Sequence, residues 1–171
     1  MIRVAICDDQ EIVCQGLSTI LNNDPDIQVV GTANNGFEVL ELVEKQQPDL
    51  VLMDLKMPEM NGIQATQKIK STYPQVKVLV LTTYDDDEWL FDAIRAGAAG
   101  YLLKDTPSTT IIQAIKGTLD GETYLDPNIA GKVMSSAARL NQTPVSRFQI
   151  QLSEREMEVL QLMARGLTNA D

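Results

Sequence analysis

The sequence predicts an α/β protein built on a doubly wound, parallel sheet of five strands. Five short apolar runs that favour strands alternate with five segments that favour helices over residues 1–121. The run VKVLVLT at residues 76–82 shows little polar–apolar alternation, which is typical of a strand buried on both faces of a parallel sheet. Strict alternation of strands and helices favours helices packed on both faces of one sheet.

The expected strands are apolar runs that end at polar or turn-forming residues. They cover about Ile2–Cys7, Ile27–Ala33, Leu50–Asp54, Val76–Thr82 and Gly100–Leu103. The expected helices fill the segments after them, near residues 10–22, 36–47, 61–72, 86–97 and 107–120.

Several of these helices carry start and stop signals. Asn61-Gly62 opens the third helix. The acidic run at residues 85–88 places negative charge at the positive end of the fourth helix, and Gly97 closes that helix. Pro107 lies in the first turn of the fifth helix, where proline is tolerated.

The pattern changes after Gly121. Asp126-Pro127 begins a further helical run near residues 127–140, with apolar residues spaced four apart. The polar, proline-containing stretch at 141–151 is typical of a linker. We therefore expect three parts: a domain at 1–121, a linker with one helix at 122–151, and the start of a second domain at 152–171.

The composition is that of a globular protein, with 44% apolar and 22% charged residues in a chain of 171. The chain has no histidine, which excludes Ser-His-Asp catalysis, Cys-His catalysis and histidine-ligated zinc. The two cysteines, Cys7 and Cys14, match neither a CxxC motif nor a zinc spacing, so two free thiols are expected. Any chemistry must therefore use carboxylates, hydroxyls, lysines or backbone groups.

The charge and hydropathy patterns argue against nucleic acid and membranes as partners of residues 1–121. The net charge is −10, and residues 1–121 carry 18 acidic and 9 basic residues. This region lacks a basic patch and should repel nucleic-acid phosphates. No apolar run reaches the roughly 18 residues that a membrane span needs, and the first residues lack a signal-peptide pattern. We expect a cytoplasmic protein with no membrane contact.

Five polar side chains fall at predicted strand ends. Asp8 and Asp9 follow the first strand, Asp54 ends the third, Thr82 ends the fourth and Lys104 follows the fifth. In a parallel sheet these ends share one edge, and ligands bind there, where the strand order reverses. In the flavodoxin-like order 2-1-3-4-5, the first and third strands are neighbours, so the three aspartates should converge. Each residue alone is common at a strand end, but the combination is not.

Three carboxylates so close together need a positive partner. At about 5 Å and an effective dielectric constant near 20, each pair repels by roughly 3 kcal/mol. Oxygen ligands with open coordination positions suit Mg²⁺, and Lys104 can supply a further positive charge. A carboxylate nucleophile is normally ionised at neutral pH and needs no general base. Phosphoryl transfer fits this set, with Asp54 attacking in line, Mg²⁺ and Lys104 neutralising phosphoryl oxygens, and Thr82 offering a hydroxyl to the product.

Three alternatives remain open at this stage. A phosphohydrolase with an aspartate nucleophile after the first strand wants a DxD pattern, whereas this chain has Asp8-Asp9-Gln10. A flavodoxin needs a loop rich in hydroxyls and glycines to bind phosphate, and CDDQE would repel phosphate. A stand-alone module could act only through protein–protein contacts.

These residues together resemble the receiver domain of two-component response regulators. The resemblance covers residues 1 to about 121, and its other motifs are Lys56-Met57-Pro58, Asn61-Gly62 and Gly100-Tyr101. It implies that Asp54 accepts a phosphoryl group from a sensor histidine kinase. It implies Mg²⁺ ligation by Asp8, Asp9, Asp54 and the backbone carbonyl of Lys56. The protein would then be a phosphoacceptor that assists only its own phosphorylation and dephosphorylation, not an enzyme in the usual sense.

The resemblance also implies a switch. Thr82 and Tyr101 are expected to move on phosphorylation and to reshape the face formed by the fourth strand, the fourth helix and the fifth strand. Because this movement should expose a new surface, a homodimer is expected on phosphorylation. One residue departs from the usual receiver pattern: Asp105 follows Lys104, where many receivers have proline.

The last 20 residues, LSEREMEVLQLMARGLTNAD, resemble the opening of a LuxR-type helix-turn-helix domain. Ser153 and Glu156 form a capping-box pattern before an apolar helical stripe. With a receiver in front, this is the NarL/FixJ architecture of transcription regulators, whose intact members bind promoter DNA. Only about a third of the module is present and the recognition helix is absent, so this chain as given is not expected to bind DNA specifically.

Overall fold

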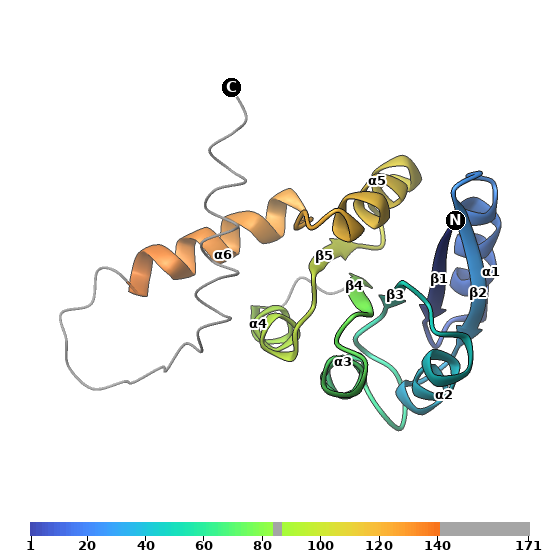
Figure 1. The fold of residues 1–171 in the computed structure, drawn as a ribbon. Coiled ribbons are helices and arrows are strands. Elements are labelled where there is room, and N and C mark those ends of the chain that lie inside the picture. The colour runs from blue at the N-terminus through green and yellow to red at the C-terminus, as the bar shows by residue number, and fades with distance from the viewer. Residues whose placement is uncertain (84–86, 141–171) are drawn as a thin grey trace.

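The computed structural model describes residues 1–83 and 87–140. Five strands form one parallel sheet in the order β2-β1-β3-β4-β5, which confirms the predicted order (Figure 1). Their bounds are β1 Ile2–Cys7, β2 Ile27–Ala33, β3 Leu50–Met53, β4 Lys77–Thr82 and β5 Gly100–Leu103. β3 ends one residue before Asp54 and β4 begins one residue after Val76, so the predicted bounds are correct to within one residue.

In the part of the chain that the structure describes, six helices follow the strands or extend the chain. Their bounds are α1 Glu11–Asn22, α2 Gly36–Gln46, α3 Gly62–Thr72, α4 Asp87–Ala96, α5 Ser108–Leu119 and α6 Pro127–Leu140. The side chain of Asn35 caps α2, and Asn61 and Gln64 form a capping box at the start of α3. Each of the six expected helices is present.

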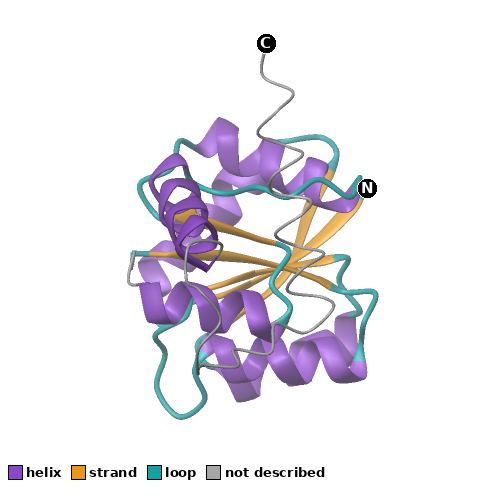
Figure 2. Cartoon of the chain, turned by 90° about the vertical axis from the view of Figure 1, so that its left-hand side faces the viewer, coloured by secondary structure: helices purple, strands orange, loops and turns teal. Residues whose placement is uncertain are grey.

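The helices cover both faces of the sheet, as Figure 2 shows. Val4 and Ile6 of β1 pack in a core with side chains of α1 and α5. Ala5 and Cys7 of the same strand point the other way, into a core with side chains of α2 and α3. Because successive strand residues face opposite sides, both sets must be apolar, which explains the unbroken apolar runs of the sequence.

A third core joins α6 to the edge of the sheet. Leu125 forms an isolated parallel bridge with Tyr101 of β5, and the amide of Asp126 donates to the carbonyl of Tyr101 at 2.9 Å. Ile129 and Val133 of α6 are buried in the same cluster as Tyr101. In Figure 1, α6 continues beyond the sheet on the side of α4 and β5. The sequence predicted this helix but not its packing on β5.

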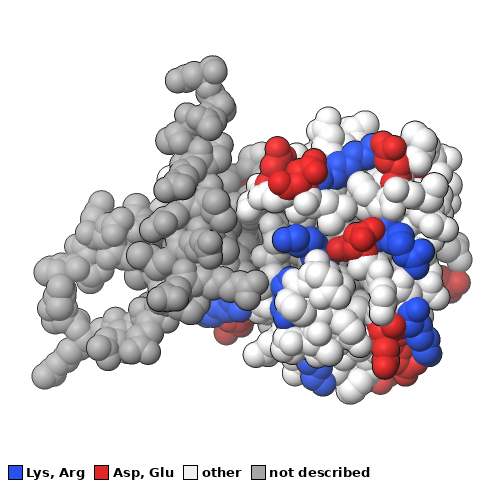
Figure 3. Space-filling model, viewed as in Figure 1, with Lys and Arg blue, Asp and Glu red and all other residues white. Residues whose placement is uncertain are grey.

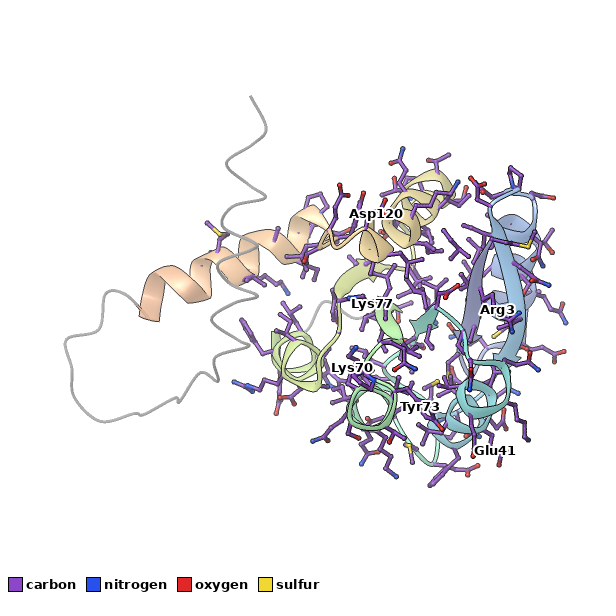
Figure 4. The ribbon with its side chains drawn as sticks, in the orientation of Figure 1. Arg3, Glu41, Lys70, Tyr73, Lys77 and Asp120 are labelled. Carbon is purple, nitrogen blue, oxygen red and sulfur yellow. The ribbon has the colours of Figure 1, made fainter. Side chains whose placement is uncertain are left out.

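The edge where the strands begin is closed by structural hydrogen bonds. Figure 4 labels Arg3 in β1, Lys77 at the start of β4, and Lys70 of α3. The guanidinium of Arg3 donates to the carbonyl of Gln46 at 2.7 Å, and Lys70 Nζ donates to the carbonyl of Val76 at 2.9 Å.

Acidic and basic side chains are interleaved on the face seen in Figure 3.

Two predictions fall on residues that the structure does not describe. They are the linker at 141–151 and the helix-turn-helix start at 152–171. Among the described residues, no helix combines the length and the hydropathy that a membrane-spanning segment requires.

Candidate functional site

The backbone of the sheet brings the three predicted aspartates to one place. The amide of Asp54 donates to the carbonyl of Cys7 at 2.8 Å, so the residue after β3 lies beside the end of β1. The amide of Asp8 donates to Ala33 at the end of β2, at 3.0 Å. One carboxylate oxygen from each of Asp8, Asp9 and Asp54 lies within 4.8 Å of the others. The expected convergence is therefore present.

Lys104 joins this acidic cluster from β5. Its Nζ lies 2.5 Å from Oδ2 of Asp8 and 3.0 Å from Oδ2 of Asp54, and its side chain is only 11% exposed. Its amide donates to the carbonyl of Thr82 at 2.8 Å, which orients the residue at the end of β5. The peptide bond from Lys104 to Asp105 is trans.

Burial and ion pairing oppose each other at these groups. Burial raises the pKa of Asp8, and the hydrogen bonds from Lys104 and from the amide of Gln10 offset this only in part. Burial by itself would lower the pKa of Lys104, but its hydrogen bonds to Asp8 and Asp54 outweigh burial and raise that pKa. Lys104 therefore remains charged at neutral pH.

The donor set fits a hard divalent cation. Three carboxylates and one ammonium group leave a formal charge of −2, which a divalent ion would cancel. Mg²⁺ prefers oxygen ligands at about 2.0–2.1 Å, so ligands on opposite sides of the ion are about 4.2 Å apart. The three carboxylate oxygens all lie within 4.8 Å of one another, so small side-chain movements could bring them around one ion. Asp9 is exposed, which leaves that side open to water and ligands.

Asp54 itself is held by the loop that follows it. Its Oδ1 accepts a hydrogen bond of 2.7 Å from the amide of Leu55, and the residue is only 4% exposed. The start of α3 packs directly on this loop, since the amide of Gly62 donates to the carbonyl of Leu55 at 2.9 Å. A Cβ at Gly62 would overlap the carbonyl oxygen of Asp54, so only glycine allows this approach.

The two predicted switch residues lie on neighbouring strands. Thr82 is fully buried at the end of β4, and the register pairs Met53 with Val80, so Thr82 lies two residues beyond that pair, at the same edge as Asp54. Tyr101 pairs with Val80 and is also buried, at 1% exposure. Both residues make interactions with their surroundings. Tyr101 lies under α6, which the sequence did not indicate.

Lys56 has a contact that the sequence analysis missed. Its exposed side chain places Nζ 5.3 Å from the centroid of the Trp89 ring in the first turn of α4. The preceding residue, Leu55, is fully buried in a cluster with Leu90 and Ala93 of the same helix. Apolar and aromatic residues at the start of α4 were the only signal in the sequence, and they do not identify their partners.

The comparisons with known proteins agree with this geometry. Residues 4–116 match the family described as the response regulator receiver domain. The transcriptional regulatory protein YxjL of Bacillus subtilis is 42% identical over 171 residues, covering 99% of this chain and 78% of the relative. The oxygen regulatory protein NreC of Staphylococcus carnosus is 39% identical over 174 residues, covering 99% and 80%.

A solved structure gives the same result. The LuxR-family response regulator from Aurantimonas sp. SI85-9A1 matches with a TM-score of 0.75 and 30% identity, over 80% of this chain and 97% of that chain. Residues 4–116, which match the receiver family, contain the acidic edge described above. The chain therefore belongs to the response regulators of two-component systems, of the NarL/FixJ type, and carries their receiver domain.

Proposed function

We propose that Asp54 accepts a phosphoryl group from a sensor histidine kinase and that this event controls transcription. The observation that carries the proposal is the cluster of Asp8, Asp9 and Asp54 within 4.8 Å, with Lys104 bonded to two of its members. One lysine offsets only part of the repulsion among three carboxylates, so the cluster favours a further positive charge.

Mg²⁺ is the proposed cofactor. Asp8, Asp9, Asp54 and the backbone carbonyl of Lys56 would hold it, and when bound it would neutralise charge on the phosphoryl oxygens. Lys104 is already within ion-pair distance of Asp54, so its ammonium group can move to a phosphoryl oxygen with little displacement. The amide of Leu55 holds Oδ1 of Asp54, so attack would come from Oδ2, which the ammonium group of Lys104 would release as it moves to the phosphoryl oxygen.

The proposed reaction is a displacement at phosphorus. Oδ2 of Asp54 attacks in line, an O–P bond forms, and the P–N bond to the histidine of the kinase breaks. The electron pair leaves with the imidazole nitrogen, which takes a proton from solvent. No base in this chain is needed, because a carboxylate is normally ionised at neutral pH. The chain is on this proposal a phosphoacceptor and assists only its own phosphorylation and dephosphorylation.

The proposed output passes through β4, α4 and β5. The hydroxyl of Thr82 would turn towards the aspartyl phosphate, and Tyr101 would follow it. Since Tyr101 packs against Ile129 and Val133, the movement would reach α6 as well as the α4–β5 face. Residues 1–121 are the proposed receiver, 122–151 the linker, and 152–171 the start of the LuxR-like DNA-binding domain that would bind promoter DNA. Phosphorylation would favour a homodimer.

A mass measurement tests the proposal. Intact mass is determined before and after incubation with acetyl phosphate and Mg²⁺, for the parent chain and for Asp54→Asn. The parent should gain one phosphoryl group and Asp54→Asn should gain none. Chelation of Mg²⁺ with EDTA should prevent the gain in the parent. An equal gain in both proteins would place the acceptor elsewhere and refute the assignment.

A further inference from the structure

The segment that follows Asp54 packs against the first two turns of α4. Leu55 is buried against Leu90 and Ala93, and Lys56 lies over the ring of Trp89, with 5.3 Å between Nζ and the ring centroid. Two successive residues are therefore held against α4: Leu55 by burial and Lys56 by a contact at the surface. This matters because the backbone between them leads directly from the phosphoacceptor to the carbonyl proposed as a metal ligand.

The contact of Lys56 with Trp89 is attractive without being strong. An ammonium group within about 6 Å of an indole centroid gains on the order of 0.5–1 kcal/mol at an exposed site. The contact adds to the restraints on the lysine side chain and favours its direction over the ring. Rotation about the N–Cα bond of residue 56 moves the side chain and the carbonyl together, so a contact that restrains the side chain also restrains this part of the carbonyl's motion.

The chain contains a second contact of the same kind in a different place. Lys68 of α3 lies 5.7 Å from the ring of Phe37 in α2. This pair joins two helices on one face of the sheet and contains no residue of the acidic cluster or of the loop at residues 54–61. It provides a matched control, since it has the same chemistry without the connection to Asp54.

We infer that Trp89 is a positioning residue: it holds Lys56 so that the backbone carbonyl of Lys56 faces the acidic cluster. The inference rests on the proposed function, because it assumes that Mg²⁺ binds at that cluster. By linkage, a contact that favours metal binding must itself change when metal binds. Mg²⁺ should therefore alter the surroundings of Trp89 in α4, and the contact should couple occupancy of the site to that helix.

The experiment uses the indole itself as the probe. Trp89 is the only tryptophan of the chain, so tryptophan emission during a titration with Mg²⁺ reports on this one side chain. Affinity for Mg²⁺ is measured in parallel by calorimetry, which does not depend on the tryptophan. The proteins are the full parent chain, Lys56→Met, Lys56→Arg, Trp89→Leu and the control Lys68→Met. Melting temperatures in EDTA report on stability without metal.

The parent should show an emission change that saturates with the calorimetric affinity. Lys56→Met and Trp89→Leu should bind Mg²⁺ more weakly than the parent by up to about fivefold, because the full strength of one exposed cation–π contact sets the upper limit of the effect. The emission change should be lost in Lys56→Met and retained in Lys56→Arg, which keeps the charge over the ring. Lys68→Met should match the parent in both measurements.

Other results would overturn the inference in distinguishable ways. If the parent binds Mg²⁺ and is phosphorylated, but Lys56→Met and Trp89→Leu bind Mg²⁺ as tightly as Lys68→Met, the positioning role is refuted and the proposed function stands. If the Mg²⁺ affinity of Lys56→Met and Trp89→Leu falls only as far as their melting temperatures in EDTA fall, the contact stabilises the fold without positioning the carbonyl, and the inference is refuted. If the parent neither binds Mg²⁺ nor gains a phosphoryl group, the proposed function fails and the inference fails with it.

Discussion

Lys104 is the residue on which the charge balance of the site depends. It forms ion pairs with both Asp8 and Asp54. Without it, the repulsion between these two carboxylates would be reduced only by solvent or ions on the open side of the cluster. Burial already raises the pKa of Asp8, which shows that its charged form is disfavoured even with Lys104 present. The lysine therefore contributes to stability most when no divalent cation is bound.

Lys104→Met should accordingly destabilise the protein in EDTA by at least about 1–3 kcal/mol, the cost of leaving a buried polar group without its partner, which is larger for a charged group. Added Mg²⁺ should recover more stability in this variant than in the parent, because the ion replaces the missing positive charge. Urea unfolding with and without Mg²⁺ measures both values. An identical loss under the two conditions would contradict the proposed metal site.

A second charged cluster lies away from the site and has a purely structural role. Lys116 of α5 forms ion pairs with Asp24 at 3.0 Å and Asp26 at 2.8 Å, in the turn between α1 and β2. The amide of Asp26 and the ammonium of Lys116 lower the pKa of Asp24. A lowered carboxyl pKa stabilises the fold above the unfolded-state pKa, and this contribution is lost as pH falls through the folded-state value.

Lys116→Met should therefore lower the melting temperature at pH 7 but have a smaller effect as the pH falls below about 4. Melting curves of the parent and the variant across this range measure the difference. A gap between the two proteins that stays constant down to the lowest pH would mean that the ion pairs do not contribute, and that only the packing of the lysine stem does.

At the scale of elements, the approach of α3 to β3 determines where Asp54 is held. Gly62 allows this approach, because any Cβ there would overlap the carbonyl oxygen of Asp54. Gly16, in the exposed middle of α1, has no atom within 4 Å of the position that a Cβ would take. The two glycines thus have opposite roles in helices of similar length.

Gly62→Ala should destabilise the protein by at least roughly 1–3 kcal/mol through overpacking against backbone, and should impair phosphorylation of Asp54. Gly16→Ala should stabilise it by about 0.5–1 kcal/mol, because alanine loses less backbone entropy in a helix. Denaturant unfolding and the intact-mass assay measure the two effects. Tolerance of alanine at position 62 would show that α3 can shift away from β3.

The packing of α6 on the sheet also depends on contacts between elements. Ile129 is fully buried against the cluster that contains Tyr101 and Leu90, whereas Met134, one helical turn and more away, is 46% exposed. Ile129→Ala should cost about 2–5 kcal/mol if α6 unfolds together with the sheet. Met134→Ala should change stability by less than about 0.5 kcal/mol. Equal, small effects would mean that α6 leaves the sheet before global unfolding.

At the scale of the whole molecule, the outer edge of strand β5 is already covered by the chain itself. Residues 124–126 pair with Tyr101, and α6 covers the same edge, so a partner that docks on α4 and β5 meets α6 as well. We expect phosphorylation to change this surface through Tyr101. The net charge of −10 opposes association of two copies at low ionic strength.

The parent chain should therefore shift towards a dimer in sedimentation velocity after treatment with acetyl phosphate and Mg²⁺ at physiological salt. Asp54→Asn, treated in the same way, should remain at its original sedimentation coefficient. Sedimentation of the parent that is unchanged after confirmed phosphorylation would refute the proposed dimer while leaving the phosphoacceptor role intact.

The sequence by itself predicted the topology and the place where three aspartates meet. Unbroken apolar strands that alternate with capped helices are local properties, and they predicted the parallel sheet and the convergence of Asp8, Asp9 and Asp54. Only the tertiary structure decided that Lys56 meets Trp89 and that Ile129 covers Tyr101. These contacts join residues more than 25 positions apart, and the amphipathic pattern of a helix shows that it has an apolar face without showing what that face packs against.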